Sequence, residues 1–414
     1  MPDIKMSKLN IAYIVSAFPV ISETFIVNQI VDMIERGHNI FIYSFEKLAP
    51  PYHQIILKYR LLDRTYYCNN FNNRNKKLKL IFQYMFSSWI VLYRILWHIL
   101  SFDIKKIQFM IHCLYMDTSL KNRQFDILHA HFGINGAIIS EIKRWKHLKG
   151  IRFITTFHGY DMHKPSFFKN YYQYLFTKGD LFTVNSNYSR NLLENLGCLS
   201  KKIEKLPVGL NTSLFVSNRP IKVNNCINIL FVGRLIEFKA PNLVVTICSE
   251  LQSKNINFKC RIIGDGELFE SLSEQIKFLS LQDKIELYGG QTQEEIIHAM
   301  DKSDIFLYPG IYDKTGRAEN QGLVLQEAQC MKLPVLVSNV GGMPEGLING
   351  ITGYVLNVGD IQGFVEKIEF LYRNPQTVEK MGNNARDFVE NNFSSEALGN
   401  KLECIYLNLL RNNQ

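Results

Sequence analysis

Two glutamates, Glu319 and Glu327, lie eight residues apart around the sequence Glu-Asn-Gln-Gly-Leu-Val-Leu-Gln-Glu. In a continuous helix their α-carbons would be ~12 Å apart. Two carboxylates that cleave a glycosidic bond are about 5 Å apart, or up to roughly 9.5 Å apart with a water molecule between them. The spacing therefore argues against a hydrolase pair and favours two contacts on one long ligand, such as the sugar and ribose ends of a nucleotide-sugar. An isolated pair at this spacing is more often two solvated side chains, so the neighbouring motifs must decide.

The segment 231–239, Phe-Val-Gly-Arg-Leu-Ile-Glu-Phe-Lys, follows a predicted strand and carries two cations. Gly233 lets the backbone approach a ligand closely. Arg234 can bind phosphate oxygens as a fork and Lys239 as a point charge. A departing nucleoside diphosphate needs such cations because negative charge builds on its oxygens. Taken alone, the pair would be two surface cations after a strand.

The chain contains no Asp-x-Asp, the kind of carboxylate arrangement that a divalent cation on a diphosphate usually needs. We therefore expect no metal and no other cofactor, and we expect the positive charge to come from side chains and a helix N-terminus. That helix should begin near Gly322. Its backbone N–H groups would favour phosphate, and the residues that supply them are Asn320, Gln321, Gly322 and Leu323.

Histidines follow two predicted strands of the first half. His158, in Thr-Phe-His-Gly-Tyr-Asp, can face a ligand and donate a hydrogen bond, or it can be a structural histidine. His129 and His131 would share one face of a strand, but no third metal ligand accompanies them. Gly264, in Ile-Ile-Gly-Asp-Gly-Glu, fits a structural turn and a loop near a nucleotide equally well.

Length and composition indicate a two-domain globular protein of 414 residues. Eight scattered cysteines without a Cys-x-x-Cys pair indicate a reducing compartment. With no signal peptide evident, we expect a cytoplasmic location. The net charge of +9 concentrates near the apolar run 81–100, which Gln83, Arg94 and His98 interrupt. That run favours a buried or amphipathic helix over a membrane span, with contact to an anionic membrane surface as the alternative. No nucleic-acid recognition motif accompanies the charge.

Alternation of strands and helices predicts an α/β fold with two doubly wound parallel sheets. Strands rich in Ile, Val, Leu and Phe without alternation are typical of parallel sheets covered on both faces. We predict strands at 10–15, 39–44, 127–129, 152–157 and 181–185, and then at 227–232, 258–263, 285–288, 305–308 and 334–338. We predict an N-terminal domain over 1–213 with a helical segment at 50–122, a C-terminal domain over 214–393, and a helix over 394–414 that packs back on the first domain.

These motifs together resemble the retaining glycosyltransferases of family 4, which have the GT-B fold of two Rossmann-like domains facing a central cleft. The resemblance covers nearly the whole chain. Its opening and the His-Ala-His-Phe-Gly motif at 129–133 look like bacterial exopolysaccharide, capsule and colanic-acid transferases. The motifs that carry it are Glu-x7-Glu at 319–327, Val-Gly-Arg…Lys at 232–239, His-Gly-x-Asp at 158–161, Asn-Ser-x-x-Ser at 185–189, Gly-Gly-x-Pro-Glu at 341–345 and Gly-x-x-Gly-Tyr at 350–354.

The resemblance implies a role for each motif. Glu319 would lie by the donor sugar, Glu327 would hold the ribose hydroxyls, and His158 would contact the sugar near the reacting centre. The loop Tyr288–Gln291, with Gly290, would border the base. Many family members have Gly-Gly in the first turn, where this chain has Ser16-Ala-Phe-Pro. Contacts from the first domain are therefore the weaker expectations; they fall on Ser22, Glu23, Thr24, His131 and Asp161.

The predicted function is retaining transfer of a sugar from a nucleotide-diphosphate donor to a hydroxyl of a glycan or lipid-linked oligosaccharide. The expected setting is bacterial surface polysaccharide synthesis: exopolysaccharide, capsule or lipopolysaccharide O-antigen. Glu319 and His158 are the catalytic candidates, although a front-face mechanism does not require either as a general base. An epimerase or phosphorylase on this fold, or a non-catalytic sugar-nucleotide-binding subunit, are the alternatives. A dehydrogenase would need a glycine-rich fingerprint after the first strand, and none is present.

Overall fold

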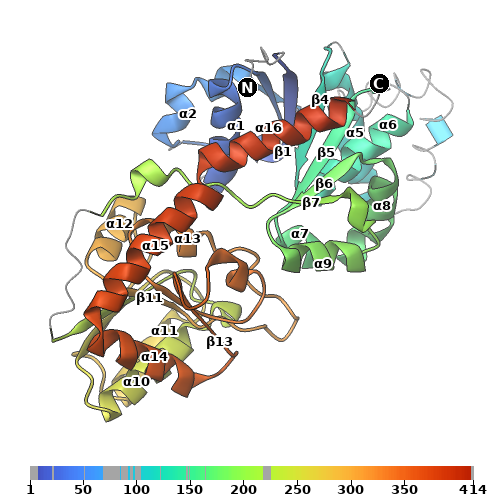
Figure 1. Cartoon of the computed structure of the whole chain (residues 1–414). Helices are drawn as coiled ribbons and strands as arrows, with labels where there is room; N and C mark the ends of the chain where they lie inside the picture. The colour runs from blue at the N-terminus through green and yellow to red at the C-terminus, as the bar shows by residue number, and fades with distance from the viewer. Residues whose placement is uncertain are drawn as a thin grey trace. The chain divides into compact units, whose positions relative to one another are not determined.

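The computed structural model describes residues 8–20, 23–50, 52–68, 84, 92–93, 97, 104–121, 123–145, 148, 150–163, 165–217 and 225–411. The chain forms two compact units. Unit 1 comprises Met1–Val184, Ser189–Leu206 and Gly399–Gln414, and unit 2 comprises Asn185–Tyr188 and Pro207–Leu398. Figure 1 traces both units and labels their elements.

Unit 1 contains a seven-stranded parallel sheet in the order β3-β2-β1-β4-β5-β6-β7. Its central strands are largely buried, as a sheet covered on both faces requires, and they carry buried histidines and threonines among their apolar residues. The strands are β1 (Asn10–Phe18), β2 (Asn39–Lys47), β3 (Thr65–Tyr67), β4 (Ile127–His131), β5 (Arg152–Phe157), β6 (Leu181–Val184) and β7 (Ile203–Lys205).

The helices of unit 1 connect these strands and cover the sheet. They are α1 (Thr24–Glu35), α2 (Gln54–Lys58), α5 (Ile104–Leu120), α6 (Gly133–Arg144), α7 (Tyr160–His163), α8 (Pro165–Lys178) and α9 (Asn187–Asn195), with 3-10 turns η2 (Leu61–Arg64) and η3 (Ser200–Lys202). The C-terminal helix α16 (Ser395–Arg411) belongs to this unit from Gly399 onward.

Unit 2 contains a six-stranded parallel sheet in the order β10-β9-β8-β11-β12-β13. Its strands are β8 (Ile227–Val232), β9 (Phe258–Ile263), β10 (Ile285–Tyr288), β11 (Ile305–Tyr308), β12 (Val335–Ser338) and β13 (Gly353–Leu356). Its helices are α10 (Pro241–Ser253), α11 (Phe269–Phe278), α12 (Gln293–Asp301), α13 (Leu323–Cys330), α14 (Ile361–Arg373) and α15 (Pro375–Phe393), with 3-10 turns η4 (Thr212–Leu214), η5 (Glu237–Lys239) and η6 (Met343–Gly346).

Every predicted strand is present, and three further strands, β3, β7 and β13, were not predicted. Strands β5, β8, β9, β10 and β11 have the predicted bounds, whereas β1, β2 and β4 run two or three residues further. The extra residues matter at β4, because they bring His131 into the strand beside His129.

The helical prediction for 50–122 is wrong at Thr65–Tyr67, which form strand β3 beside β2. A β-branched residue followed by two aromatic residues suits the edge of a sheet. Most of the predicted helix over 81–100 lies outside the described residues. In the part of the chain that the structure describes, no helix is both long and apolar enough to cross a membrane.

Each sheet reverses its strand order at one point, between β1 and β4 in unit 1 and between β8 and β11 in unit 2. Doubly wound sheets bind ligands at such switch points, beyond the carboxyl ends of the strands. The candidate residues Gly233 and Arg234 follow this rule, because they come directly after β8. Tyr308, which was not predicted, ends the neighbouring strand β11. In unit 1, His131 ends β4 and His158 comes directly after β5.

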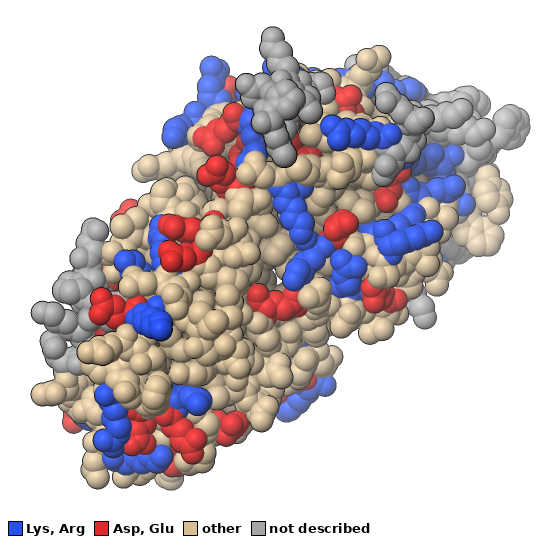
Figure 2. Space-filling view, in the orientation of Figure 1, with Lys and Arg blue, Asp and Glu red and all other residues tan. Residues whose placement is uncertain are grey.

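Charged side chains of both signs are interspersed over the face drawn in Figure 2. The net charge of +9 is therefore accompanied by neighbouring acidic groups on this face.

Candidate functional site

Glu319 is held by two side chains from different elements of unit 2. The Lys239 ammonium donates to Oε2 of Glu319 at 2.9 Å, and the Tyr308 hydroxyl donates to the same oxygen at 2.9 Å. The lysine ends the turn η5 that follows β8, and the tyrosine ends β11. Two of the predicted site residues, Lys239 and Glu319, are thus brought into direct contact at the switch point.

The charge of Glu319 is stabilised by these partners. Burial raises the pKa of its carboxyl, but the Lys239 charge, the two side-chain hydrogen bonds and the backbone N–H of Asn320 outweigh it. The pKa of Glu319 therefore lies below its ordinary value, and the group is an anion at neutral pH. Burial and the neighbouring Glu319 anion raise the pKa of Tyr308, so its hydroxyl stays a donor.

Two glycine positions allow the loops at the strand ends to pack closely. A Cβ on Gly264 would lie 2.0 Å from the carbonyl oxygen of Gly233, and Gly264 has a φ of +150°. A Cβ on Gly342 would lie 1.8 Å from the carbonyl oxygen of Asn320. The loops after β8 and β9 can therefore approach each other at Gly264, and the backbone beside Glu319 is closely packed at Gly342.

Glu327 differs from Glu319 in having no polar partner. It lies on α13, which begins at Leu323 after Gly322 in a left-handed conformation. Burial raises the pKa of Glu327 to about 7, and its carboxylate makes no hydrogen bond or ion pair with any residue described. The structure thus presents one charged, fully engaged glutamate and one unengaged glutamate on the same segment.

The remaining predicted residues of unit 2 differ in their exposure and in their hydrogen-bond partners. Arg234 is exposed and makes no hydrogen bond or ion pair within the described ranges. The Gln321 side chain exchanges hydrogen bonds with the backbone of Val208, so only its main chain is available to a ligand. Tyr288 is exposed and donates to Glu286. Of its neighbours in the loop, Gly290 is exposed and Gln291 is half-buried.

Three histidines of unit 1 form a stack. The rings of His129 and His131 lie 4.6 Å apart, and those of His131 and His158 lie 5.2 Å apart and nearly parallel. Nδ1 of His131 is 3.0 Å from Nε2 of His158. Burial lowers the pKa of His129 and of His158 to about 3 and holds that of His131 well below its ordinary value, so the rings are neutral.

Asp161 fixes the backbone on which His158 is mounted. Its carboxylate accepts hydrogen bonds from the N–H groups of His158, Gly159 and Gly133. Burial raises the pKa of Asp161 to about 6, although these hydrogen bonds oppose the shift. Asp161 is therefore placed to orient a turn.

The first turn supplies the weaker candidates. Ser22 lies outside the described residues. Glu23 precedes α1, and burial raises its pKa to about 7. Thr24 is the first residue of that helix. In the described part of the chain, no three His, Cys, Asp or Glu side chains come together in a way that could hold a metal ion.

Sequence reasoning missed Tyr308 as a partner of Glu319. One signal was present, because a phenol ends a predicted buried strand at the edge where a ligand is expected. It also missed Tyr406, whose hydroxyl forms a hydrogen bond of 2.6 Å with Nδ1 of His129. No local signal marks Tyr406, since it is one apolar-face residue of a C-terminal amphipathic helix.

Solved structures show the same fold. A glycosyltransferase from Rickettsia africae superposes with a TM-score of 0.69 at 23% identity, covering 98% of this chain and 100% of that one. Anabaena HepE in complex with UDP gives a TM-score of 0.70 at 14% identity, covering 95% and 98%. The fold is that of the GT-B glycosyltransferases.

Family profiles match almost the whole length. The profile described as Glycosyltransferase Family 4 matches residues 22–214, and the one described as Glycosyl transferases group 1 matches residues 218–388. The chain is therefore a glycosyltransferase with a family 4 domain followed by a group 1 domain.

Similar proteins share this length. A putative colanic acid biosynthesis glycosyltransferase of Salmonella typhimurium is 27% identical over 96% of this chain and 99% of its own. An amylovoran biosynthesis glycosyltransferase of Erwinia amylovora is 28% identical over 93% of this chain and 96% of its own.

Proposed function

We propose that this glycosyltransferase moves a sugar from a nucleotide-diphosphate donor to a hydroxyl of a glycan or lipid-linked oligosaccharide during bacterial surface polysaccharide synthesis, with retention at the anomeric carbon. The contrast between Glu319 and Glu327 carries the proposal. One carboxylate is charged and positioned, and the other is half-buried and has no hydrogen-bond or ion-pair partner among the described residues. Their environments suit two different ends of one donor. Relatives named for colanic acid and amylovoran biosynthesis support the setting.

The donor diphosphate would bind at the switch point of unit 2. Arg234 is unengaged there, and the Lys239 ammonium has three N–H groups, of which its bond to Glu319 uses one. The start of α13, from Gln321 to Leu323, adds backbone N–H groups and a favourable dipole, whereas the N–H of Asn320 is used by Glu319. These groups can stabilise the charge that develops on the leaving diphosphate.

We propose that Arg234 and Lys239 neutralise the diphosphate charge in place of a metal ion, and that sugar transfer requires no metal. A chelator should then leave the rate unchanged, whereas a fall in rate that Mg²⁺ or Mn²⁺ restores would contradict this part of the proposal.

Glu319 would contact the donor sugar near its anomeric carbon, and His158 would donate a hydrogen bond to a sugar hydroxyl. Glu327 would accept hydrogen bonds from the ribose hydroxyls, which would supply the partners that its carboxylate lacks. The base would lie along Gly264 and the loop Tyr288–Gln291. The leaving phosphate would help to deprotonate the acceptor in a front-face reaction, so that neither Glu319 nor His158 is required as a general base.

The test begins with a panel of nucleotide-sugars assayed with and without glycan acceptors. Turnover that requires an acceptor supports transfer, whereas conversion of the donor alone would indicate an epimerase. The anomeric coupling constant of the product reports retention. Glu319→Gln should still bind the donor and lose most of the transfer rate, while Glu379→Gln, on the exposed face of α15, should behave like the parent. Equal turnover by Glu319→Gln and the parent would contradict the role given to Glu319.

The acceptor setting predicts contact with a membrane surface. The protein would be cytoplasmic and peripheral on the inner face of the membrane. Flotation with vesicles that contain anionic lipid at low salt tests this. Absence of binding would remove the membrane from the proposal and leave the transferase activity untouched.

A further inference from the structure

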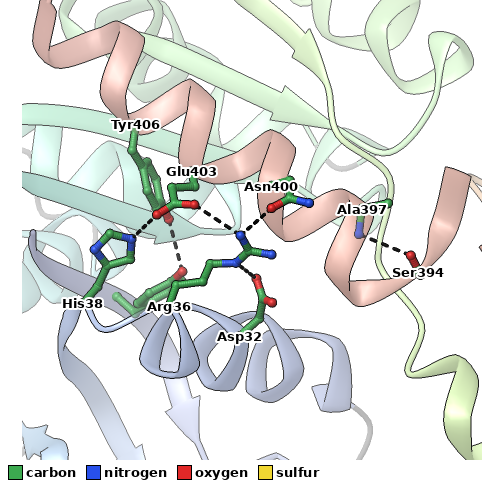
Figure 3. A network of polar contacts seen from close by, with 9 residues as sticks. Asp32, Arg36, His38, Ser394, Ala397, Asn400, Glu403 and Tyr406 are labelled. Carbon is green, nitrogen blue, oxygen red and sulfur yellow. Dashed lines mark hydrogen bonds and ion pairs between the residues drawn. The ribbon is translucent and has the colours of Figure 1, made fainter. Parts of the chain in front are cut away.

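The C-terminal helix α16 is fixed to unit 1 by a buried polar network. Glu403 accepts from the Arg36 guanidinium at 3.2 Å and lies 3.0 Å from Nε2 of His38 (Figure 3). Arg36 also donates to Asn400 at 2.6 Å and to Asp32 at 2.9 Å. Both the position and the rotation of α16 about its axis are therefore specified.

This position of α16 buries a second polar side chain of the helix against the sheet. Tyr406 lies three residues after Glu403, so the two side chains project from the same face of α16. Tyr406 is fully buried, and its hydroxyl is 2.6 Å from Nδ1 of His129 and 3.1 Å from the hydroxyl of Tyr13. A residue near the end of the chain thereby completes the core around β1 and β4.

His129 is held at both ring nitrogens. Its Nε2 is 2.7 Å from the hydroxyl of Thr156, which in turn is 2.5 Å from that of Thr183. The neutral ring has one N–H and one acceptor nitrogen, so one hydroxyl accepts and the other donates. Either way, the plane of the His129 ring is fixed by Tyr406 on one side and Thr156 on the other.

Two more histidines continue the stack that begins at the His129 ring, and Phe25 and Phe132 also contact the His158 ring. His131 stacks on His129 at 4.6 Å, and His158 stacks on His131 at 5.2 Å while Nδ1 of His131 lies 3.0 Å from Nε2 of His158. Nδ1 of His158 and Nε2 of His131 are buried and have no hydrogen-bond partner within the described structure. A buried nitrogen without a partner costs free energy unless a ligand satisfies it.

We infer that Tyr406 is a positioning residue for sugar transfer: through His129 and His131 it sets the plane of the His158 ring and the direction of its free nitrogen. The inference rests on the proposed contact between His158 and the sugar. It assigns the C-terminal helix a part in the reaction beyond completing the core. Asp161 fixes the backbone of His158, so the backbone and the ring of His158 are held by different residues.

The test compares two variants that each lose one hydroxyl from the same buried cluster. Tyr406→Phe removes the bond to His129, whereas Tyr13→Phe removes the bond to Tyr406 and leaves the one to His129 in place. Both rings remain, so packing is matched. We expect Tyr406→Phe to lower kcat about tenfold, because small errors in placing a reacting group are costly. Donor KM should change little, and Tyr13→Phe should stay within about twofold of the parent.

Two further readouts separate positioning from simple destabilisation. Tyr406→Phe should move the ring nitrogen signals of His129, His131 and His158 in spectra of protein labelled with ¹⁵N-histidine, and Tyr13→Phe should leave those of His131 and His158 in place. In a His158→Ala background, Tyr406→Phe should cause no further loss of kcat, since residues that act through one another are not additive.

The inference is overturned if Tyr406→Phe leaves the His158 signals unchanged, if Tyr13→Phe lowers kcat equally, or if the two losses add in the double variant. Should Tyr406→Phe fail to fold, Thr156→Val releases the other nitrogen of His129 and must produce the same signal changes. The spectra need no substrate. Moved signals in a protein that transfers no sugar would therefore reject the proposed function and leave the coupling of Tyr406 to His158 standing.

Discussion

Replacing Glu327 by glutamine should stabilise the protein and weaken its binding to the donor. The side chain keeps its size and loses its charge. Burial raises the pKa of Glu327 from an ordinary value of 4.5 to about 7, and no described group pairs with the carboxylate. The folded protein therefore pays a cost to keep an anion there, and a neutral amide removes that cost.

The magnitude follows from the pKa. A rise from 4.5 to about 7 corresponds to about 3 kcal/mol, which is the preference of the folded state for the protonated form. Below about pH 4.5 both states hold the proton, and no difference exists. As pH rises from there to about 7, the unfolded chain has lost the proton and the folded one retains it, so stability falls. The full cost applies above pH 7.

Chemical unfolding at pH 5 and at pH 8 measures this difference. Glu327→Gln should gain up to about 3 kcal/mol over the parent at the higher pH and much less at the lower one. Glu379→Gln, which changes an exposed carboxylate on α15, is the matched control and should show neither effect.

Donor affinity should rise with pH, whereas the stability contributed by Glu327 falls. Ribose hydroxyls donate to a carboxylate, so binding favours the ionised form, and affinity for a nucleoside diphosphate should fall about tenfold per pH unit below 7 in the parent. In Glu327→Gln the affinity should be weaker and nearly independent of pH. Isothermal titration at several pH values measures both. A glutamine variant that is less stable than the parent at pH 8, or a parent affinity that does not change with pH, would refute the reasoning.

Two other predictions follow from contacts in unit 2. Lys239→Met removes the cation beside Glu319, which should raise the pKa of that carboxyl and move the acidic limb of the pH–rate profile to higher pH. It should cost up to about 3 kcal/mol in an unfolding titration, because the anion loses its cationic partner and keeps only hydrogen bonds such as that from Tyr308. An unchanged profile would show that the pair does not control Glu319. Gly264→Ala should destabilise the protein by several kcal/mol, since its Cβ would overlap the carbonyl oxygen of Gly233, whereas Gly359→Ala, also at positive φ but in open space, should cost only about 1 kcal/mol. Equal unfolding midpoints for the two alanine variants would contradict this account.

The regular strands could be read from sequence because they are buried on both faces and so consist of uninterrupted apolar runs. Strand β11 is of this kind, and β8 departs from it only at Asn228. The missed strands β3, β7 and β13 have only three or four residues each. Strands β3 and β7 lie at the two edges of one sheet, and β13 lies at an edge of the other. Their conformation depends on pairing with a neighbouring strand, which no local pattern reveals.

The same division applies to the candidate site. Local motifs identified Glu319, Arg234 and His158, because strand ends and helix starts are local features with recognisable residue types. The motifs could not show that Glu327 lacks a partner, since that depends on every element packed around α13.

The amino-acid sequence by itself determined the alternation of strands and helices, the two parallel sheets and the segments that carry the chemistry. Only the tertiary structure decided which of these residues meet. Lys239 and Glu319 are 80 residues apart, and His129 and Tyr406 are 277 residues apart. Such pairs form because sheet order and helix packing bring distant strand ends together. The free energy for that arrangement comes from burying the whole core, which no single motif encodes.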